Sequence, residues 1–214
     1  MAEVVTIIDY GIGNLLSVCR AFEKCHANVV FADNPDKIIS ADKLVLPGVG
    51  AFSNGMNGLR KHELIEPLKA YAKTGKPLLG ICLGMQMLFT SSDEFGYTPG
   101  LGLIKGKVSI ITPLGKDGLP LKVPHIGWSQ LNRVHGGAPW ENSIFKDLKT
   151  DSHAYFVHSY TAVPLHENER LADAQYGSAR ISAAVKHDNL YGCQFHPEKS
   201  GPIGLAMIQN FVNL

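Results

Sequence analysis

The segment Gly-Ile-Cys-Leu-Gly at 80–84 carries the clearest chemistry in this chain. An apolar run precedes it and a helical pattern follows at once, which is typical of a nucleophile elbow with cysteine in place of serine. Such a turn strains the backbone and needs small neighbours, which Gly80 and Gly84 supply. The helix N-terminus that follows favours a thiolate over a thiol. We therefore predict that Cys82 is a nucleophile.

A proton-transfer partner for this cysteine is expected near the far end of the chain, in Gln-Phe-His-Pro-Glu at 194–198. A histidine beside the nucleophile can accept its proton and then protonate a leaving amine, while a carboxylate holds the ring in the required tautomer. Glu198 can do this for His196 if the chain turns at Pro197. His-Pro-Glu alone has little specificity, so the triad of Cys82, His196 and Glu198 is a hypothesis that depends on the fold.

A third segment could stabilise the negative oxygen that develops during acyl transfer. The apolar run 44–46 ends in Pro-Gly-Val-Gly at 47–50. Backbone N–H groups of such a loop can face a ligand, although the pattern is also typical of a turn that ends a strand. Because acyl transfer requires donors where the oxyanion forms, we expect one donor at the amide of Leu83. The other is expected at the amide of Val49 or Gly50.

The remaining cysteines and glycines predict no cofactor. Cys19, Cys25 and Cys193 are expected to be inert core residues. No CxxC or other zinc-like spacing occurs, so no metal site is predicted. Gly-Ile-Gly-Asn at 11–14 follows an apolar run, but it lacks the third glycine of a dinucleotide-binding loop.

Alternating strand and helix patterns in the first half would position these residues. Strands are predicted at 4–9, 28–32, 43–46 and 78–82, and helices at 14–25, 52–60 and 64–73. From about residue 96, turns link strand-like runs at 108–111, 154–160, 183–186 and 191–195, before a closing helix at 205–211. We therefore expect one α/β domain over residues 1–214. Its central, mainly parallel sheet would be buried between helices and carry an antiparallel extension.

Composition narrows the classes of function. The 214 residues are 45% hydrophobic and 18% charged, as in ordinary globular proteins. A net charge of +1 argues against a nucleic-acid-binding surface. The apolar run 4–8 is too short for a secretory segment, and no run approaches the roughly eighteen residues of a membrane span. We expect a cytoplasmic protein with reduced thiols and no membrane segment.

Taken together and in this order, the three motifs resemble those of class I, triad-type glutamine amidotransferases. They are Pro-Gly-Val-Gly at 47–50, Gly-Ile-Cys-Leu-Gly-Met-Gln at 80–86 and Gln-Phe-His-Pro-Glu at 194–198. The combination is highly specific and spans most of the chain. The resemblance implies a flavodoxin-like fold and glutamine as the substrate. It also implies a γ-glutamyl thioester on Cys82, with glutamate and ammonia as products.

Within that class the chain is most similar to the glutaminase subunits of imidazole glycerol phosphate synthases. Four segments carry this similarity: Ile-Asp-Tyr-Gly-Ile-Gly-Asn at 8–14, Pro-His-Ile-Gly-Trp at 124–128, Tyr-Phe-Val-His-Ser-Tyr at 155–160, and Lys-Ser at 199–200. Subunits of that family pass ammonia to a (β/α)8-barrel cyclase, which makes imidazole glycerol phosphate and AICAR in histidine biosynthesis. The resemblance therefore implies a heterodimer in which the partner's ligand controls glutaminase turnover.

The resemblance also implies roles for individual residues. The triad positions match Cys82, His196 and Glu198, and the oxyanion strand matches residues 47–50. Residues expected in or near the glutamine pocket are Gln86, Glu94 and Tyr155. Residues expected at the cyclase interface are Trp128, His158 and Lys199. Gln86 and Glu94 could instead be solvated helix residues, and Trp128 could belong to the core. The loop at 11–14 is expected near the glutaminase site.

Three other interpretations remain open at this point. A paralogous amidotransferase could use the same motifs to feed ammonia to a barrel synthase that makes surface-polysaccharide sugars. A peptidase or other hydrolase of related fold could also use a Cys–His pair, although Pro-Gly-Val-Gly and His-Pro-Glu argue against it. A catalytically silent interaction module is disfavoured because all three triad residues are present.

Overall fold

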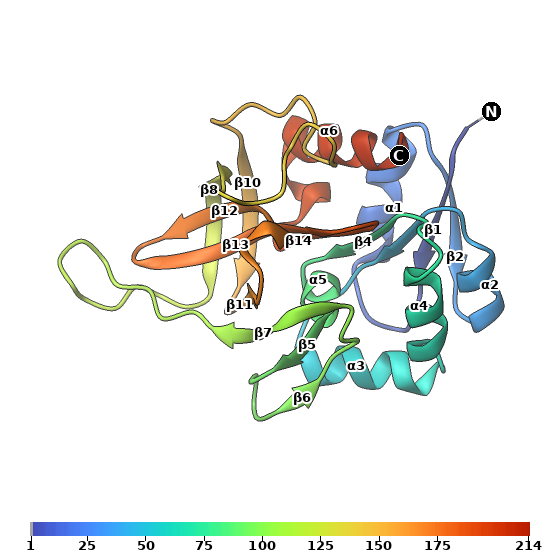
Figure 1. Ribbon diagram of the computed structural model, residues 1–214, viewed down its shortest axis with the longest axis horizontal. Helices are drawn as coiled ribbons and strands as arrows, with labels where there is room; N and C mark the ends of the chain where they lie inside the picture. The colour runs from blue at the N-terminus through green and yellow to red at the C-terminus, as the bar shows by residue number, and fades with distance from the viewer. Residues whose placement is uncertain (1) are drawn as a thin grey trace.

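The computed structural model describes residues 2–214. At its centre is an eight-stranded sheet (Figure 1). In sheet order its strands are β2 (Asn28–Ala32), β1 (Val4–Ile8), β3 (Leu44–Leu46), β4 (Leu78–Ile81), β14 (Leu190–Cys193), β13 (Ala179–His187), β12 (Arg170–Tyr176) and β9 (Asn132–Arg133).

The first five of these strands are parallel, and the last three are antiparallel. β1 pairs with β2 and β3, and β4 pairs with β3 and β14, all in parallel. The order 2-1-3-4 followed by a fifth parallel strand is that of flavodoxin-like sheets. β13, β12 and β9 then continue the sheet in antiparallel fashion. The prediction of a mainly parallel α/β sheet with an antiparallel extension is confirmed.

Helices cover both faces of the parallel strands (Figure 1). One face packs against α1 (Leu15–Lys24) and α6 (Gly201–Val212). The other packs against α3 (Phe52–Lys61), α4 (Ile65–Ala72) and α5 (Leu83–Met87), with α2 (Pro35–Ser40) lying against α4 and β2. Within the described residues no helix is long and apolar enough to cross a membrane.

Successive residues of the parallel strands point into opposite cores. Ile7 and Val45 belong to the core under α1 and α6, whereas Ile8 and Leu46 belong to the core under α3 and α5. Side chains alternate along a strand, so burial on both sides favours apolar residues at nearly every position. This explains why the sequence shows continuous apolar runs at these strands.

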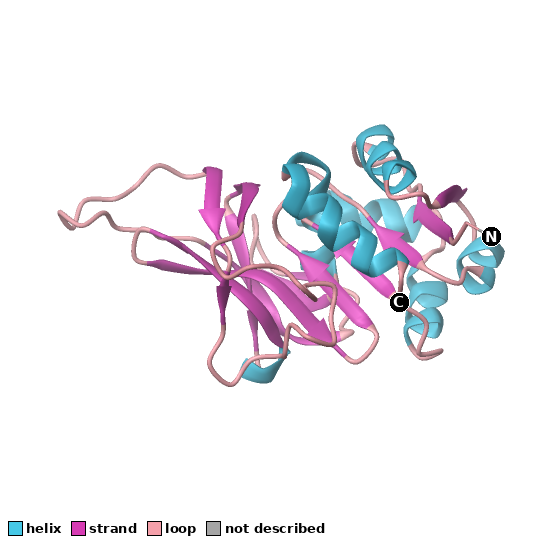
Figure 2. Ribbon diagram, turned by 90° about the horizontal axis from the view of Figure 1, so that it is seen from above, coloured by secondary structure: helices cyan, strands magenta, loops and turns pink. Residues whose placement is uncertain are grey.

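The remaining strands form two smaller sheets, which gather away from most of the helices (Figure 2). One has the order β11 (Tyr160–Pro164), β7 (Ile104–Ile110), β5 (Phe89–Ser92) and β6 (Thr98–Pro99). The other pairs β10 (His153–His158) with β8 (His125–Gln130). Two 3-10 helices, η1 (Glu167–Glu169) and η2 (Pro197–Lys199), complete the fold.

Two predictions for this region were wrong. Residues 154–160 do not form one strand, because the chain leaves β10 after His158 and begins β11 at Tyr160 in a different sheet. The later strands also do not all extend the central sheet. An apolar run reveals a strand but not its neighbour, which is set by long-range pairing.

Helix α2 was missed because it is only six residues long, although Asn34 caps it by accepting from the amide of Lys37.

Candidate active site

The motifs that the sequence singled out converge at the carboxyl ends of the parallel strands. Tyr10 follows β1, Pro47 follows β3, Cys82 follows β4 and His196 lies just beyond β14. Ligands in open α/β sheets bind at this edge, near the point where the strand order reverses. Here the reversal lies between β1 and β3. The fold therefore brings together segments more than a hundred residues apart.

Cys82 occupies a strained turn between β4 and α5. Its φ and ψ are 53° and −110°, in a region that side chains other than glycine rarely adopt. The turn is held at both ends, because the Cys82 amide donates to the carbonyl of Cys193 at 2.7 Å and its carbonyl accepts from the amide of Gln86 at 3.2 Å. Such a conformation costs about 1–3 kcal/mol, which the surrounding structure must supply.

Two glycines make this turn possible. A Cβ at Gly84 would lie 1.8 Å from the carbonyl oxygen of Leu46, and a Cβ at Gly80 would lie 2.6 Å from the amide nitrogen of Met85. Both contacts are with backbone atoms, which cannot move aside without shifting a strand or a helix. The helix after the nucleophile therefore packs on β3 and β4 at a distance that only glycine permits.

His196 and Glu198 form a hydrogen-bonded pair next to this turn. His196 Nδ1 lies 2.8 Å from Oε1 of Glu198, because the 3-10 helix η2 turns the chain back at Pro197. The backbone of His196 is fixed as well: its amide donates to the carbonyl of Tyr155 at 3.0 Å, and its carbonyl accepts from the hydroxyl of Ser200 at 2.7 Å. A carboxylate on Nδ1 places the proton there and leaves Nε2 for the sulfur.

The electrostatic balance favours a charged imidazole at this position. Burial by itself lowers the pKa of His196, but its interactions with Cys82 and then with Glu198 outweigh burial and raise this pKa to about 10. A protonated imidazole beside a cysteine stabilises the thiolate and is ready to protonate a leaving group. The pair can therefore supply both a nucleophile and a general acid.

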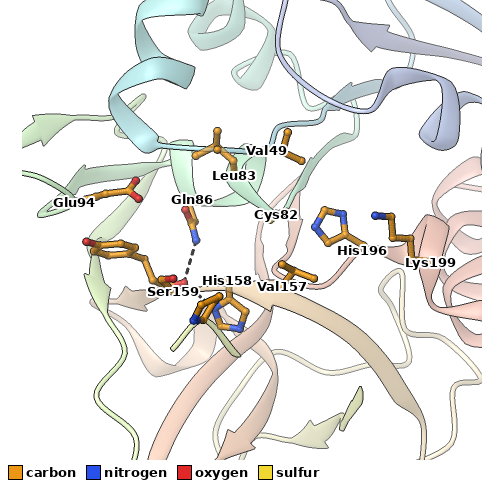
Figure 3. Close-up of a pocket in the computed structure, with 13 residues that line it drawn as sticks. Val49, Cys82, Leu83, Gln86, Glu94, Val157, His158, Ser159, His196 and Lys199 are labelled. Atoms are coloured by element: carbon orange, nitrogen blue, oxygen red, sulfur yellow. Dashed lines mark hydrogen bonds between the residues drawn. The ribbon is translucent and has the colours of Figure 1, made fainter. Parts of the chain in front are cut away.

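A cavity of about 380 Å³ opens over Cys82 (Figure 3). Figure 3 shows Gln86 and Glu94 on one side of Cys82, and His196 and Lys199 on the other. The lining residues are Val49, Gly50, Cys82, Leu83, Gln86, Glu94, Pro124, Val157, His158, Ser159, Tyr160, His196 and Lys199.

The segment 47–50 lies against the elbow, and its contacts bear on the predicted oxyanion donors. The Leu83 amide donates to the carbonyl of Gly48 at 3.3 Å, so that carbonyl must turn away before an oxyanion can use the amide. Pro47 is fixed by the hydroxyl of Tyr10, which donates to its carbonyl at 2.7 Å. Gly50 has a φ of +95°, which glycine adopts without strain. The loop at 11–14 also reaches this segment, since a Cβ on Gly13 would contact Pro47.

The two residues expected to bind glutamine both line the cavity and are held by specific hydrogen bonds. Gln86 donates from Nε2 to the carbonyl of Tyr160 at 3.1 Å and to Oε1 of Gln194 at 2.9 Å. Glu94 Oε2 accepts from the amide of Phe52, the first residue of α3, at 2.6 Å. The other Glu94 oxygen and the Gln86 carbonyl oxygen have no hydrogen-bond partner among residues 2–214 and are not fully buried. Each can therefore serve a ligand.

The other predicted residues are divided between the cavity and its surroundings. Tyr155 does not line the cavity; its ring lies 5.9 Å from that of Trp128, and its backbone supports His196. Trp128 is 56% exposed and so does not belong to the core. His158 lines the cavity and is only 6% exposed, whereas Lys199 lines it while remaining exposed. The interface roles of Trp128, His158 and Lys199 stay predictions.

Several residues at the site were not assigned from sequence. Pro124, Val157, Ser159 and Tyr160 lie within segments noted for family similarity, but their contact with the cavity depends on where β8, β10 and β11 pack. Tyr10 also lies in such a segment, 8–14, but its hydrogen bond to the carbonyl of Pro47 depends on the pairing of β1 with β3. Within the described residues, no group of three or more His, Cys, Asp or Glu side chains has metal-binding geometry.

Comparison with known proteins agrees with this geometry. The family model for class-I glutamine amidotransferases matches residues 6–214. The chain is 52% identical to imidazole glycerol phosphate synthase subunit HisH 1 of Legionella pneumophila (strain Lens), covering 98% of this chain and 99% of that protein. It is 45% identical to subunit HisH of Sulfurimonas denitrificans, covering 97% of each. A chain of PurLQS from Thermotoga maritima shares the fold with a TM-score of 0.70 at 20% identity; the match covers 100% of this chain and 99% of that chain. This chain therefore belongs to the class-I glutamine amidotransferase family, among the HisH subunits of imidazole glycerol phosphate synthase.

Proposed function

We propose that this chain hydrolyses glutamine to glutamate and ammonia and delivers the ammonia to a cyclase subunit in histidine biosynthesis. The observation that carries the proposal is the cavity in which Cys82, on its strained turn, meets the hydrogen-bonded pair of His196 and Glu198. Similarity to HisH subunits over nearly the full length supports the pathway.

The first half of the reaction forms a thioester. The Cys82 thiolate attacks the γ-carbonyl carbon of glutamine, which forms the S–C bond and places negative charge on the oxygen. His196 gives its proton to the amide nitrogen as the C–N bond breaks, and ammonia leaves. Glu198 keeps the ring oriented and stabilises its positive charge before that transfer. The oxyanion is stabilised by the Leu83 amide and an amide of the strand 47–50.

The second half hydrolyses the thioester. Water gives a proton to His196 and adds its oxygen to the acyl carbon. The C–S bond then breaks, which releases the γ-carboxylic acid and restores the thiolate beside a protonated His196. The carboxylic acid loses its remaining proton to solvent and becomes glutamate. The same imidazole therefore serves as acid and then as base.

Glutamine would be recognised by the free oxygens of Glu94 and Gln86, two side chains whose other polar atoms already form hydrogen bonds within the protein. The second oxygen of Glu94 suits the α-ammonium group of the substrate. The free Gln86 carbonyl oxygen suits an N–H donor of the substrate, since its own nitrogen is held by Tyr160 and Gln194. A ligand without such donors would leave these oxygens unpaired and bind more weakly.

We further propose that the partner is a (β/α)8-barrel cyclase, and that the isolated chain rests in a poorly active state. The Gly48 carbonyl on the Leu83 amide supports a closed oxyanion site that must rearrange before turnover. Trp128 and Lys199 would then contact the cyclase, in the cytoplasm where histidine biosynthesis takes place. A partner loaded with its ligand would favour the open arrangement by binding it more tightly.

The test is glutamine-dependent synthesis by the chain combined with its own barrel partner. Cys82→Ser should fold normally and abolish glutamine hydrolysis, while added ammonium salt still supports synthesis by the partner. Isolated wild-type chain should hydrolyse glutamine far more slowly than the complex. Unchanged hydrolysis in Cys82→Ser would refute the catalytic assignment, and full activity of the isolated chain would refute the resting state.

The pathway is tested separately by complementation. The gene, expressed with its barrel partner, should rescue a histidine auxotroph that lacks its own glutaminase subunit, and Cys82→Ser should not. Failure to rescue, with glutamine hydrolysis intact in vitro, would assign the chain to an ammonia-using pathway other than histidine biosynthesis.

A further inference from the structure

A buried glutamine that the triad does not include contacts the sulfur of the nucleophile. Gln194 follows β14 directly, is fully buried, and lies two positions before His196. Its Nε2 lies 3.7 Å from Sγ of Cys82. This is within hydrogen-bonding distance for sulfur, whose radius exceeds that of oxygen. The hydrogen-bond partners of the amide decide which of its two ends faces the sulfur.

That orientation follows from the backbone carbonyl of Tyr160, which can only accept. Gln86 lies 3.1 Å from this carbonyl, so the facing atom of Gln86 must be its nitrogen. The second hydrogen of the same nitrogen points to Gln194 at 2.9 Å, so the facing atom of Gln194 must be its oxygen. The nitrogen of Gln194 is therefore left on the side of Cys82.

The Tyr160 carbonyl is itself held from the other side. His158 donates to it from Nδ1 at 2.9 Å. Burial lowers the pKa of His158 to about 4, so its ring is neutral near pH 7 and Nε2 accepts from Nδ1 of His125 at 3.0 Å. Nε2 of His125 in turn accepts from the hydroxyl of Ser129 at 3.0 Å. Each donor in this series of hydrogen bonds has one acceptor. The Tyr160 carbonyl, which orients both glutamines, is therefore fixed.

We propose that Gln194 donates a hydrogen bond to the thiolate of Cys82 and thereby stabilises the nucleophile in its reactive form; this rests on the proposed role of Cys82. An N–H donor gains much more from a charged acceptor than from a neutral thiol, so it shifts the balance toward the thiolate. Because the amide is uncharged, it leaves His196 free to lose and regain its proton. One strand end thus delivers both a hydrogen-bond donor and an acid to the sulfur.

The alternative is that Gln194 only fills space between β14 and the elbow. Gln194→Glu keeps the shape and the oxygen that faces Gln86 and removes the N–H donor, but its negative charge also repels the thiolate, so the uncharged variant Gln194→Met decides between the two roles. Gln194→Met keeps the length and removes all hydrogen bonding. Gln175→Glu is the matched control, since Gln175 is exposed and bonds only the carbonyl of Gly177.

The readout is the second-order rate of alkylation of Cys82 by iodoacetamide in the full chain, located by peptide mapping. Gln194→Glu should slow alkylation by about tenfold or more. Gln194→Met should slow it less, and Gln175→Glu should match the wild type. In the complex, Gln194→Glu should lower kcat with KM for glutamine nearly unchanged, since this variant keeps the oxygen that holds Gln86 and residue 194 does not line the cavity.

A folded Gln194→Met variant that is alkylated at the wild-type rate would overturn the role of Gln194. Should that variant unfold, the same result in Gln194→Glu would overturn it equally. The two proposals fail in different ways: absence of glutamine hydrolysis in the wild-type complex refutes the function, whereas equal alkylation rates refute only the hydrogen bond.

Discussion

Cys82 directly follows β4 and Cys193 ends the neighbouring parallel strand β14, yet only Cys82 lines the cavity. β4 and β14 are paired, and the amide of Cys82 donates to the carbonyl of Cys193. Cys193 keeps the extended conformation of its strand, and its side chain is completely buried. Cys82 turns to positive φ and lines the cavity beside His196. The backbone at each strand end, not the residue type, therefore separates a reactive thiol from a core residue.

The surroundings of the two thiols also differ, and they keep Cys193 neutral while placing polar groups beside Cys82. Burial, with smaller contributions from Glu198 and Cys82, raises the pKa of Cys193 well above its usual value and keeps that thiol neutral. Its sulfur lies 3.8 Å from the carbonyl of Gly80, to which the thiol donates. Cys82 instead has His196 and the amide of Gln194 nearby. Four predictions test this contrast, from the largest effect to the smallest.

Removing the carboxylate that orients His196 should affect only Cys82. Glu198→Gln keeps the shape but no longer fixes the tautomer or stabilises the charged ring, so glutamine hydrolysis by the complex should fall about 10³-fold. Steady-state kinetics measure the loss, and circular dichroism checks the fold. Hydrolysis within tenfold of wild type would show that Cys82 does not depend on this pair.

Adding a single methyl group behind the turn should destabilise the whole protein. Gly84→Ala would place Cβ 1.8 Å from the Leu46 carbonyl and lower the free energy of unfolding by more than about 3 kcal/mol. Gly75→Ala is the control: its φ is +79° but a Cβ there meets nothing within 4 Å, so the loss should be about 1 kcal/mol. Equal losses in urea denaturation would mean that the close approach of α5 is not required.

Truncating the core cysteine should cost stability and spare activity. Cys193→Ala leaves a small cavity in the central sheet, with an expected loss of about 1–2 kcal/mol. The thermal midpoint and the urea midpoint measure this loss. Glutamine hydrolysis should stay within about threefold of wild type, and a loss comparable to that of Glu198→Gln would give Cys193 a role in the chemistry.

The charged form of His196 should contribute to stability in a defined pH range. Its pKa of about 10 in the folded chain lies above the value of about 6.5 expected on unfolding. The contribution is therefore fully present below pH 6.5 and is lost as the pH rises through about 10. The difference in unfolding free energy between wild type and His196→Gln should shrink by about 1 kcal/mol or more over this range. A constant difference would contradict a raised pKa.

Local sequence patterns were sufficient to predict those helices, strands and turns that depend on residues close together in the chain. The predicted helix 52–60 corresponds to α3, and the predicted strand 78–82 to β4, which ends one residue earlier because Cys82 begins the turn. The glycines around Cys82 pointed to a tight turn, and its dihedral angles agree. The first half was predictable where an apolar strand is followed by a helix of clear period, and the six-residue helix α2 after β2 was the exception.

The second half was less predictable because its strands choose distant partners. Nothing in the run 154–160 indicates that its two ends join different sheets. That division places Tyr155 beside Trp128 and outside the cavity, while Tyr160 orients Gln86 within it. Gln194 stood in a motif already noted, but its contact with Cys82 depends on the pairing of β14 with β4.

The sequence by itself predicted Cys82 as the nucleophile, the substrate class through family motifs, and the parallel half of the fold, since these predictions depend on short segments. Only the tertiary structure decided that His196 and Gln194 face Cys82, because both come from a segment over a hundred residues away. It also decided the state of the Leu83 amide and the direction of each amide in the cavity. Those features follow from hydrogen-bond partners that sequence spacing does not specify.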